Sequence, residues 1–334
     1  MISVVTGGAG FIGSHLVNEL ISRGETEVHV IDSLTYAADL DRLPNPNKKE
    51  YFFHKLDISN KLKLDETFSL ITERSKDAPI SIYNAAAESH VDRSIVNASQ
   101  FIESNILGTQ NLVELSSKYR IKRFLQVSTD EVYGSISKGE AHETFHLNPS
   151  SAYAASKASA DLLVMAHART HGLDTIITRC VNNFGTGQLN EKFIPRMIYK
   201  SILGEDLPIY GDGSNVREWL HVSDHVNALI LCMHAGSANS IYNIGSGERI
   251  DNLTIAQKII AQIPGSKSEI KFVRDRPGHD ERYAVSSSKI REELLWKPAL
   301  EFNSILEETV KSEIKRMLAE NPEKLLEIEN FYAK

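Results

Sequence analysis

The sequence predicts an α/β protein in which a Rossmann-type, doubly wound parallel sheet is joined to a smaller C-terminal α+β lobe. Two observations support this fold class. Short apolar runs alternate with longer amphipathic stretches up to about residue 178. These runs lack the strict alternation of a half-exposed strand, as expected for strands that helices cover on both faces. Strand and helix in turn form crossover units, which build a parallel sheet.

The individual elements follow from these patterns. Strands are expected at residues 2–5, 28–31, 51–56, 80–83, 124–127 and 175–178, and helices at 11–23, 61–74, 98–118 and 151–171. Beyond residue 179, pieces containing glycine and proline separate helical stretches at 193–203, 223–234, 253–262, 287–295 and 304–317. We therefore expect a first domain over residues 1–180 and a smaller ligand-binding domain over 181–334, with some chain crossing between them. The cleft between the two lobes is the expected ligand site.

Composition excludes several classes of protein. The chain has 334 residues, 41% hydrophobic and 24% charged, which argues against disorder. Its formal net charge is −7 and no block is strongly basic, so no nucleic-acid partner is expected. No apolar run approaches the roughly 18 residues of a membrane span, and no signal peptide is recognised at the start. The 2 cysteines are too few for a disulfide framework, so a cytoplasmic location is expected.

A glycine-rich turn follows the first expected strand. Gly7, Gly10 and Gly13 have the spacing G-x-x-G-x-x-G, and a helical pattern starts directly after them. Such a turn lets backbone N–H groups approach a pyrophosphate and directs a helix N-terminus at that anion. Three spaced glycines also occur in ordinary turns. The position between the first strand and the first helix is what favours dinucleotide binding.

Two aspartates end the next two strands. Asp32 ends the second strand, where a carboxylate can hydrogen-bond the adenosine ribose and repel a 2′-phosphate, so NAD is favoured over NADP. Asp57 ends the third strand and is a candidate contact for the adenine. For both residues the structural alternative is an aspartate that only forms a turn.

A tyrosine and a lysine share one face of an expected helix. Tyr153 and Lys157 are four residues apart, and therefore one helical turn apart. A nearby ammonium favours phenolate over phenol, so we expect Lys157 to lower the pKa of Tyr153 and to make it a general base. Tyr51 and Lys55 have the same spacing, but their stretch reads as a strand, in which four residues rise roughly 13 Å. We interpret that second pair as structural.

Two adjacent carboxylates follow the fifth expected strand. Asp130 and Glu131 lie at its carboxyl end, the edge at which doubly wound sheets bind ligands. An acid beside a base suits a dehydration, because one protonates a leaving hydroxyl while the other removes a carbon-bound proton. Thr129 is positioned to hydrogen-bond the oxygen that Tyr153 deprotonates. The alternative reading of this sequence is a solvated acidic turn.

One motif is misleading. Residues 142–146 read His-Glu-Thr-Phe-His, which fits the H-E-x-x-H pattern of zinc metalloproteases. That motif needs a sustained helix, whereas here it lies between Gly139 and Pro149 with no third ligand at the expected spacing. We therefore predict no metal site.

The combined motifs are similar to those of one superfamily. Residues 6–13, Asp32, Tyr153 and Lys157 together resemble the extended short-chain dehydrogenases/reductases. Residues 128–134, Ser-Thr-Asp-Glu-Val-Tyr-Gly, resemble the nucleotide-sugar 4,6-dehydratases, and among them those that act on dTDP-glucose. Epimerases and decarboxylases of the superfamily usually have another residue in place of Asp130. The likeness continues through residues 86–94, 182–185, 191–195, 217–220 and 275–280, and so covers nearly the whole chain.

The resemblance implies a redox-neutral dehydration with NAD as the cofactor. Tyr153, assisted by Lys157 and Thr129, takes the proton of the 4-hydroxyl while a hydride leaves C4. Glu131 then removes the C5 proton, Asp130 protonates the departing 6-hydroxyl, and the hydride returns to C6. Because the cofactor is regenerated in each turnover, we expect it to stay bound.

The resemblance also assigns the binding residues. For NAD it implies Gly7, Gly10, Phe11, Ile12, Gly13, Asp32, Ser33, Leu34, Thr35, Asp57, Ile58, Ala85, Ala86, Ala87, Ser104, Tyr153, Lys157 and Asn183. For the nucleotide sugar it implies Glu88, Ser89, Thr129, Asn182, Lys192, Phe193, Pro208, Tyr210, Arg217, Asn252, Arg276 and His279. The cations among them suit phosphate oxygens. Read singly, Lys192 or Arg217 is an ordinary surface charge.

The chain departs from the family pattern in one loop. Residues 186–190 read Thr-Gly-Gln-Leu-Asn, where the family commonly has proline and aromatic residues, so the base or the sugar can differ from dTDP-glucose. Asn84 is a smaller departure. A homodimer through helices 98–118 and 151–171 is expected by analogy, although their apolar residues also suit an intramolecular core. The alternatives are a UDP-sugar 4-epimerase or decarboxylase, a dehydratase of another NDP-hexose, and a non-catalytic NAD(H)-binding regulator.

Overall fold

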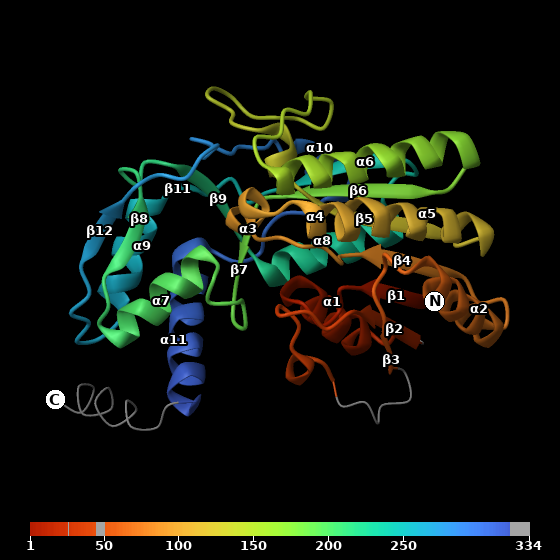
Figure 1. Cartoon of the computed structure of the whole chain (residues 1–334), viewed down its shortest axis with the longest axis horizontal. Helices are drawn as coiled ribbons and strands as arrows, with labels where there is room; N and C mark the ends of the chain where they lie inside the picture. The colour runs from red at the N-terminus through yellow and green to blue at the C-terminus, as the bar shows by residue number, and fades with distance from the viewer. Residues whose placement is uncertain (26, 45–50, 321–334) are drawn as a thin grey trace.

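The structure confirms the predicted Rossmann-type sheet (Figure 1). The structure is a computed structural model and describes residues 1–25, 27–44 and 51–320. Seven parallel strands lie in the order β10-β6-β5-β4-β1-β2-β3. Their bounds are β1 Ile2–Thr6, β2 Glu27–Asp32, β3 Tyr51–Lys55, β4 Ile80–Asn84, β5 Arg123–Thr129, β6 Thr175–Cys180 and β10 Ser240–Ile244. The strand order reverses between β1 and β4, which opens a crevice at the carboxyl edge.

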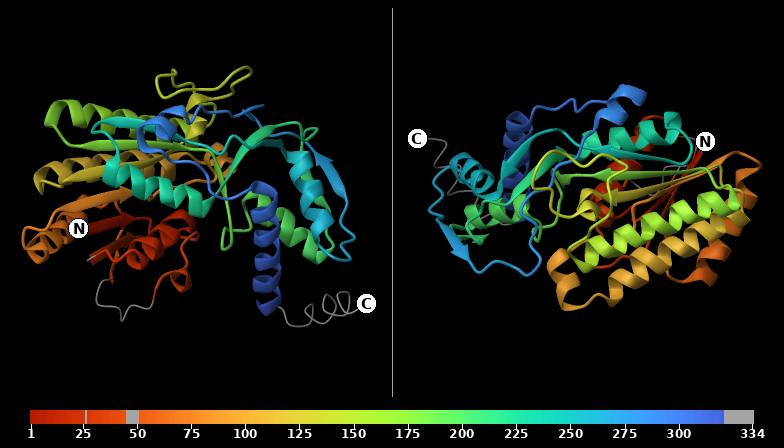
Figure 2. Two further views of the ribbon diagram at one scale, coloured as in Figure 1. Left: turned by 180° about the vertical axis from the view of Figure 1, so that it is seen from behind. Right: turned by 90° about the horizontal axis from the view of Figure 1, so that it is seen from above.

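Helices cover both faces of this sheet (Figure 2). They are α1 Phe11–Ser22, α2 Lys61–Ser75, α3 Val91–Val96, α4 Ser99–Phe101, α5 Gly108–Lys118, α6 Ala152–His171, α8 Val222–Ala235 and α10 Ser288–Leu294, with the short 3-10 helices η1 Leu40–Arg42 and η3 Asp130–Tyr133. Neighbouring residues of β1 face different helix layers. Val5 packs with α1 and α8 on one face of the sheet, and Val4 packs with α2 and α5 on the other. Burial on both faces explains why the strands read as continuous apolar runs.

The second half of the chain returns to the large sheet more extensively than the sequence indicates. Strand β10 pairs in parallel with β6, and Ser240 lies opposite Ile176 in the register. Helix α8, expected in the smaller lobe, instead packs on the sheet beside α1. Its run Ala-Leu-Ile-Leu-Cys-Met is apolar on every side, so it suits a buried position against a sheet.

Over its described residues, the smaller lobe contains two short sheets and three helices. One sheet has the order β11-β9-β7 and the other pairs β12 with β8. The bounds are β7 Asn182–Phe184, β8 Leu207–Tyr210, β9 Val216–His221, β11 Arg249–Asp251, β12 Ile270–Val273, α7 Phe193–Leu203, α9 Asn252–Gln262 and α11 Phe302–Glu320. Phe184, Ile198, Trp219, Ile255 and Leu306 pack together as its separate core.

The helix expected at residues 98–118 contains a π-helical segment, η2 Ile102–Leu107, between α4 and α5. This segment directs Asn105 into the protein, where the side chain is 1% exposed. Its amide accepts from the backbone N–H of Glu88, donates to the Glu88 carbonyl, and donates to Ser156 Oγ. Asn105 thus fixes the chain after β4 against α6. None of the helices within the described ranges is long and apolar enough to cross a membrane.

Candidate active site

A cavity of about 400 Å³ lies at the carboxyl edge of the large sheet and reaches the smaller lobe. It brings together every predicted cofactor residue except Leu34. Those that line it are Gly7, Gly10, Phe11, Ile12, Gly13, Asp32, Ser33, Thr35, Asp57, Ile58, Ala85, Ala86, Ala87, Ser104, Tyr153, Lys157 and Asn183. Leu34 instead forms a turn at φ 58°, and its backbone N–H donates to Asp32 at 2.8 Å.

The glycine-rich turn forms a cradle that only glycine fits. Gly7 has φ +66°, and a Cβ there would lie 2.6 Å from the Cα of Ala86. A Cβ on Gly13 would collide with the carbonyl oxygen of Gly7. Gly10 precedes α1 without any side-chain cap, so the first amides of this helix are left to the cavity. The geometry suits a pyrophosphate held at a helix N-terminus.

Asp32 has a structural task besides the predicted one. Its carboxylate accepts from the backbone N–H groups of Ala9 and Leu34 at 2.9 and 2.8 Å, and so braces the glycine-rich turn. Burial raises the pKa of Asp32, while these two hydrogen bonds oppose the shift. The residue also lines the cavity. Its remaining lone pairs can therefore meet a ribose, as predicted.

Asp130 and Glu131 begin η3, directly after β5, in different electrostatic surroundings. Asp130 is 3% exposed, and burial raises its pKa well above the ordinary value, with the charges of Glu131 and Glu218 adding to the rise. Burial also raises the pKa of Glu131, but Arg276, Arg217 and Lys192 oppose that shift. Burial and neighbouring carboxylates thus favour the protonated form more strongly in Asp130 than in Glu131, which is the order that an acid and a base need.

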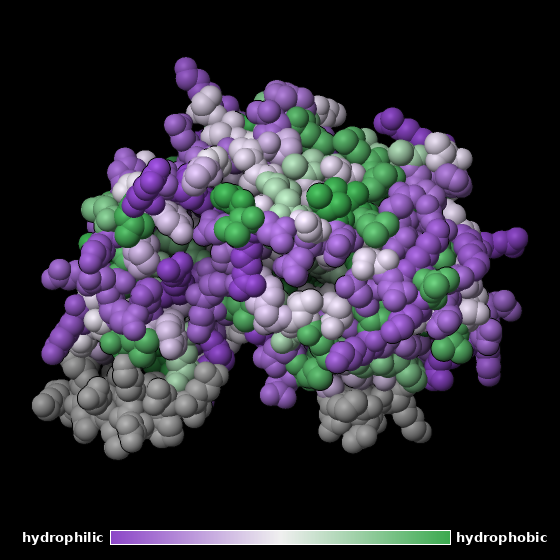
Figure 3. All heavy atoms as spheres, viewed as in Figure 1, coloured by the Kyte–Doolittle hydropathy of each residue, from purple (hydrophilic) through white to green (hydrophobic). Residues whose placement is uncertain are grey.

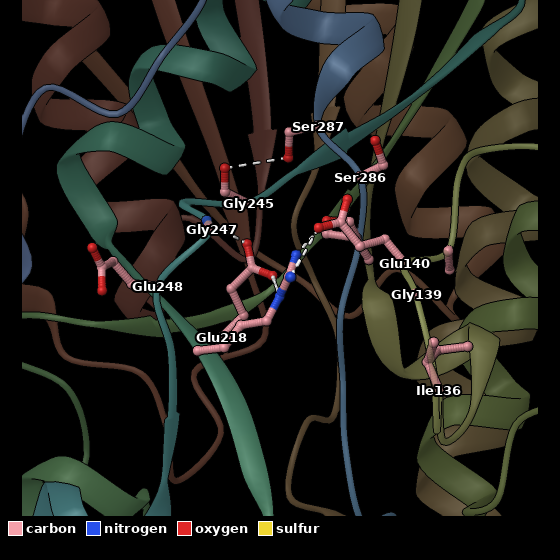
Figure 4. Close-up of polar contacts among 12 residues, drawn as sticks. Ile136, Gly139, Glu140, Glu218, Gly245, Gly247, Glu248, Ser286 and Ser287 are labelled. Carbon is pink, nitrogen blue, oxygen red and sulfur yellow. Dashed lines mark hydrogen bonds and ion pairs between the residues drawn. The ribbon is translucent and has the colours of Figure 1, made fainter.

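Glu218, on β9, is a fully buried carboxylate whose charge acts on Asp130. Figure 4 shows Glu218 among its own polar partners. It accepts from the backbone N–H of Gly247 at 2.8 Å and from Arg249 Nε at 3.0 Å, and Arg249 also pairs with Glu140 at 2.8 Å. These partners hold Glu218 in place, so its charge acts on Asp130 from a fixed position.

Tyr153 and Lys157 lie in the first half of α6, whose N-cap Ser151 accepts from the Ala154 backbone. Lys157 is 3% exposed and donates to the carbonyl of Val127 at 2.6 Å, and burial lowers its pKa to about 8. The expected lowering of the Tyr153 pKa is wrong for the protein alone. Burial and the charge of Glu131 raise that pKa, and only a hydrogen bond with Thr129 is a notable opposing effect.

The predicted substrate residues divide into two groups. Glu88, Ser89, Thr129, Asn182 and Lys192 line the cavity. Lys192 Nζ donates to the carbonyl and the hydroxyl of Ser89 at 2.7 and 3.3 Å, which links the two lobes. The Oδ1 atom of Asn182 is buried without a protein partner. Such an atom is suited to accept a hydrogen bond from a ligand.

The second group belongs to the smaller lobe and does not line this cavity. Its members are Phe193, Pro208, Tyr210, Arg217, Asn252, Arg276 and His279. Asp92 accepts from Arg276 at 2.9 Å and from Tyr210 at 3.2 Å, and Arg217 donates to the Asp280 carbonyl at 2.9 Å. The positive charges of Arg217 and Arg276 still act on Glu131, where they oppose the rise in its pKa that burial causes.

The remaining members of the second group have other neighbours. His279 pairs with Asp275 at 2.6 Å, Phe193 packs beside Trp219, and Asn252 begins α9. Pro208 lies in β8 opposite Lys271.

Sequence reasoning missed several cavity residues. Ser128, Cys180 and Val181 line it at strand ends, so the strand pattern alone could have identified them. His225 has no such signal, because it comes from α8 and reaches Asn183 across the fold at 3.0 Å. The other missed residues include Ala37, Ala38, Gln100, Glu103, Gln188, Leu189 and Glu191.

The H-E-x-x-H sequence has a structural role. Glu143 accepts from the backbone N–H of Asn243 at 2.9 Å, which fixes a loop to β10. Over the described ranges, no group of three potential ligands is arranged to hold a metal ion.

Comparison with known proteins gives consistent results. The family model described as GDP-mannose 4,6 dehydratase matches residues 4–309. The low-salt glycan biosynthesis protein Agl12 of Haloferax volcanii is 45% identical over 311 residues, which cover 92% of this chain and 96% of that protein. A dTDP-glucose 4,6-dehydratase of an Actinoplanes species is 43% identical over 314 residues, which cover 92% of this chain and 96% of that protein. The crystal structure of the Streptomyces venezuelae dTDP-glucose 4,6-dehydratase DesIV, with NAD bound, has a TM-score of 0.87 at 41% identity, covering 96% of this chain and 98% of that one.

Proposed function

Because the chain belongs to the GDP-mannose 4,6 dehydratase family, within the extended short-chain dehydrogenases/reductases, we propose that it is an NAD-dependent nucleotide-sugar 4,6-dehydratase. Its substrate is dTDP-glucose, and its products are the 4-keto-6-deoxy sugar nucleotide and water. The single observation that carries the proposal is the pair Asp130 and Glu131, which meets the same cavity as Tyr153 and Lys157.

The cavity fits NAD at its Rossmann end. The cradle of Gly7 and Gly13 accepts a pyrophosphate, and Asp32 lies where the adenosine ribose hydroxyls would be bound. When bound, NAD⁺ accepts the hydride from C4 and returns it to C6, and its cationic ring favours the phenolate form of Tyr153. The larger lobe holds this cofactor, and the smaller lobe holds the nucleotide of the sugar.

The side chains of the protein move the protons. Tyr153 accepts the proton of the 4-hydroxyl, Thr129 hydrogen-bonds that oxygen, and Lys157 lies one helical turn further along the same face of α6. Glu131 removes the C5 proton, which the new 4-ketone has made acidic. Asp130, kept protonated by burial and neighbouring carboxylates, gives its proton to the 6-hydroxyl as the C6–O bond breaks. As the hydride reaches C6, Glu131 returns a proton to C5, and the proton taken up by Tyr153 replaces the one that Asp130 gave to the departing water. Atoms and protons then balance, because the substrate loses one water and the cofactor ends as it began.

A 4-epimerase or decarboxylase would use the same Tyr153 and Lys157. Neither reaction needs an acid beside a base at the position of Asp130 and Glu131. A non-catalytic NAD(H)-binding protein could use Tyr153 and Lys157 to bind the dinucleotide, but it would have no use for Asp130 and Glu131. A dehydratase activity therefore gives a role to more of the side chains in the cavity than either alternative activity does.

Substrate choice can be tested by offering dTDP-, UDP-, GDP- and CDP-hexoses separately and following water loss by mass spectrometry. We expect dTDP-glucose to be converted fastest, without stoichiometric added NAD. Preference for another base would correct the substrate, and an epimer of unchanged mass would overturn the dehydratase.

We also propose that the protein is a cytoplasmic homodimer. Ile95, Val96, Ile102, Leu107 and Leu162 are exposed apolar residues on α3, η2 and α6, and Figure 3 shows apolar side chains gathered over this region. Exposed apolar patches of this kind favour a protein partner. The free thiols of Cys180 and Cys232 are consistent with a reducing compartment. In sedimentation experiments we expect a dimer, and Leu162→Glu should yield monomer; a monomeric wild type would contradict the proposal.

A further inference from the structure

A thin wall separates the cofactor cavity from a second cavity. The wall is formed by residues 186–191, between β7 and α7. Gln188, Leu189 and Glu191 line the main cavity, and the same residues line a second cavity of about 290 Å³ together with Tyr36, Arg42, Asn190 and Arg316. Because hollow space lies on both sides, side-chain packing contributes little to the position of this wall. Hydrogen bonds have to hold it.

The shortest hydrogen bond to these residues comes from α11, near the end of the described chain. The backbone N–H of Gly187 donates to Glu313 Oε1 at 2.7 Å, and Glu313 is fully buried. The other carboxylate oxygen accepts from Arg316 Nε at 3.0 Å and Nη2 at 2.7 Å, which fixes the orientation of the group. Figures 1 and 2 show the connection between β7 and α7 lying beside α11.

The wall is also tied to the elements that form the dinucleotide end of the cavity. The carbonyl of Thr186 lies 3.3 Å from His15 Nε2 on α1, and Tyr36 donates to Glu191 at 3.1 Å. Tyr36 follows Asp32 by four residues, and the neighbouring Ala37 and Ala38 line the cavity. The wall therefore lies against the cofactor side of the cavity.

We propose that Glu313 is a positioning residue that holds residues 186–191 over the dinucleotide and thereby retains NAD between turnovers. This inference rests on the proposed function, in which the cofactor is regenerated and gains from staying bound. Glu313 does not line the cavity and acts through Gly187. The loop it holds is the one in which this sequence departs from the family pattern.

The test is the rate of NAD release from the purified holoenzyme, measured by stopped-flow exchange against fluorescent NADH. Glu313→Ala should release NAD about tenfold faster or more, as expected for a lost hydrogen bond to a charged group, and should raise the KM for NAD more than it lowers kcat. Glu313→Gln keeps an acceptor for Gly187 and should restore most of the retention.

Val310→Ala is the matched control, because Val310 is 1% exposed on the same helix and packs in the core of the smaller lobe. It loosens α11 without removing the bond to Gly187, so NAD release should stay at the wild-type rate. Equal acceleration in Val310→Ala and Glu313→Ala, or no acceleration in Glu313→Ala, would overturn the inference. The release assay needs no sugar nucleotide, so faster release from Glu313→Ala supports the inference even if dehydration of every hexose fails.

Discussion

The two lobes hold their site residues by different means. In the larger lobe, Asp130 and Glu131 directly follow a strand, and Lys157 lies one helical turn after Tyr153. In the smaller lobe, Arg276 and Arg217 are held by distant partners, a carboxylate on α3 and a backbone carbonyl. The difference indicates that neighbouring positions at one strand end or on one helix place the catalytic groups, whereas contacts between elements distant in the sequence hold the arginines of the smaller lobe.

The lobes also differ in the charges that they bring to the site. The chain has a net charge of −7, so its overall field does not favour two diphosphate ligands. Positive charge is instead local: Arg276, Arg217 and Lys192 act on Glu131, and we propose that they bind the diphosphate of the sugar nucleotide while the N-terminus of α1 binds that of the dinucleotide. These cations oppose the rise in the Glu131 pKa, so recognition and catalysis are coupled at one residue.

The largest effect should come from the larger lobe. Tyr153→Phe removes the general base, and we expect kcat to fall about 10²- to 10⁴-fold. Tyr51→Phe is the matched control, since Tyr51 has a lysine at the same spacing but lies in β3 outside the cavity. The measurement is the steady-state rate of water loss for each of the two variants and the wild type. Equal rates for Tyr153→Phe and Tyr51→Phe would contradict the assignment of Tyr153 as the general base and of Tyr51 as structural.

Glu131→Gln should separate the two halves of the reaction. Without the base, elimination should slow about 10²- to 10⁴-fold while oxidation at C4 continues, so bound NADH should accumulate and be visible by its absorbance. Glu66→Gln, which removes an exposed carboxylate on α2 outside the cavity, should turn over normally. Normal product formation by Glu131→Gln would refute its role as base.

A smaller effect is expected from the smaller lobe. Arg276→Gln should raise the KM for the sugar nucleotide about 10- to 100-fold, because charge-assisted contacts with the diphosphate are lost, and should lower kcat less. Arg274→Gln removes the same charge from an exposed position two residues away and should leave KM unchanged. A loss confined to kcat would place Arg276 with the catalytic residues instead.

The smallest effect concerns stability. Because burial lowers the pKa of Lys157 from 10.5 to about 8, the folded chain holds a charged lysine out of water at pH 7, which costs up to about 3 kcal/mol. As pH rises from 8 through 10.5, the unfolded state binds more protons and this cost disappears. Lys157→Met should therefore be more stable than the wild type in urea at pH 7, with a smaller advantage at pH 10. A stability advantage of Lys157→Met over the wild type that grows with pH would contradict this prediction.

Local patterns were sufficient to predict the larger lobe. The glycine spacing, Asp32 and the Tyr153–Lys157 pair depend on one strand end, one turn or one helical face, and each lies in the cavity. Features that depend on distant pairings were not predictable. Strand β10 joins the sheet from beyond residue 239, and Asn105 turns inward only because a π-helical segment shifts the phase of its helix. The raised pKa of Tyr153 likewise results from burial and from carboxylates that the helix pattern does not reveal.

The central claim is that one cavity oxidises C4, eliminates water and reduces C6 of the same sugar. The most direct measurement uses dTDP-glucose with deuterium at C4 and locates the label in the product by NMR and mass spectrometry. The account predicts a product lighter by one water molecule, with the deuterium in the new methyl group at C6. Label retained at C4 of a product of unchanged mass, or label lost to solvent, would contradict it.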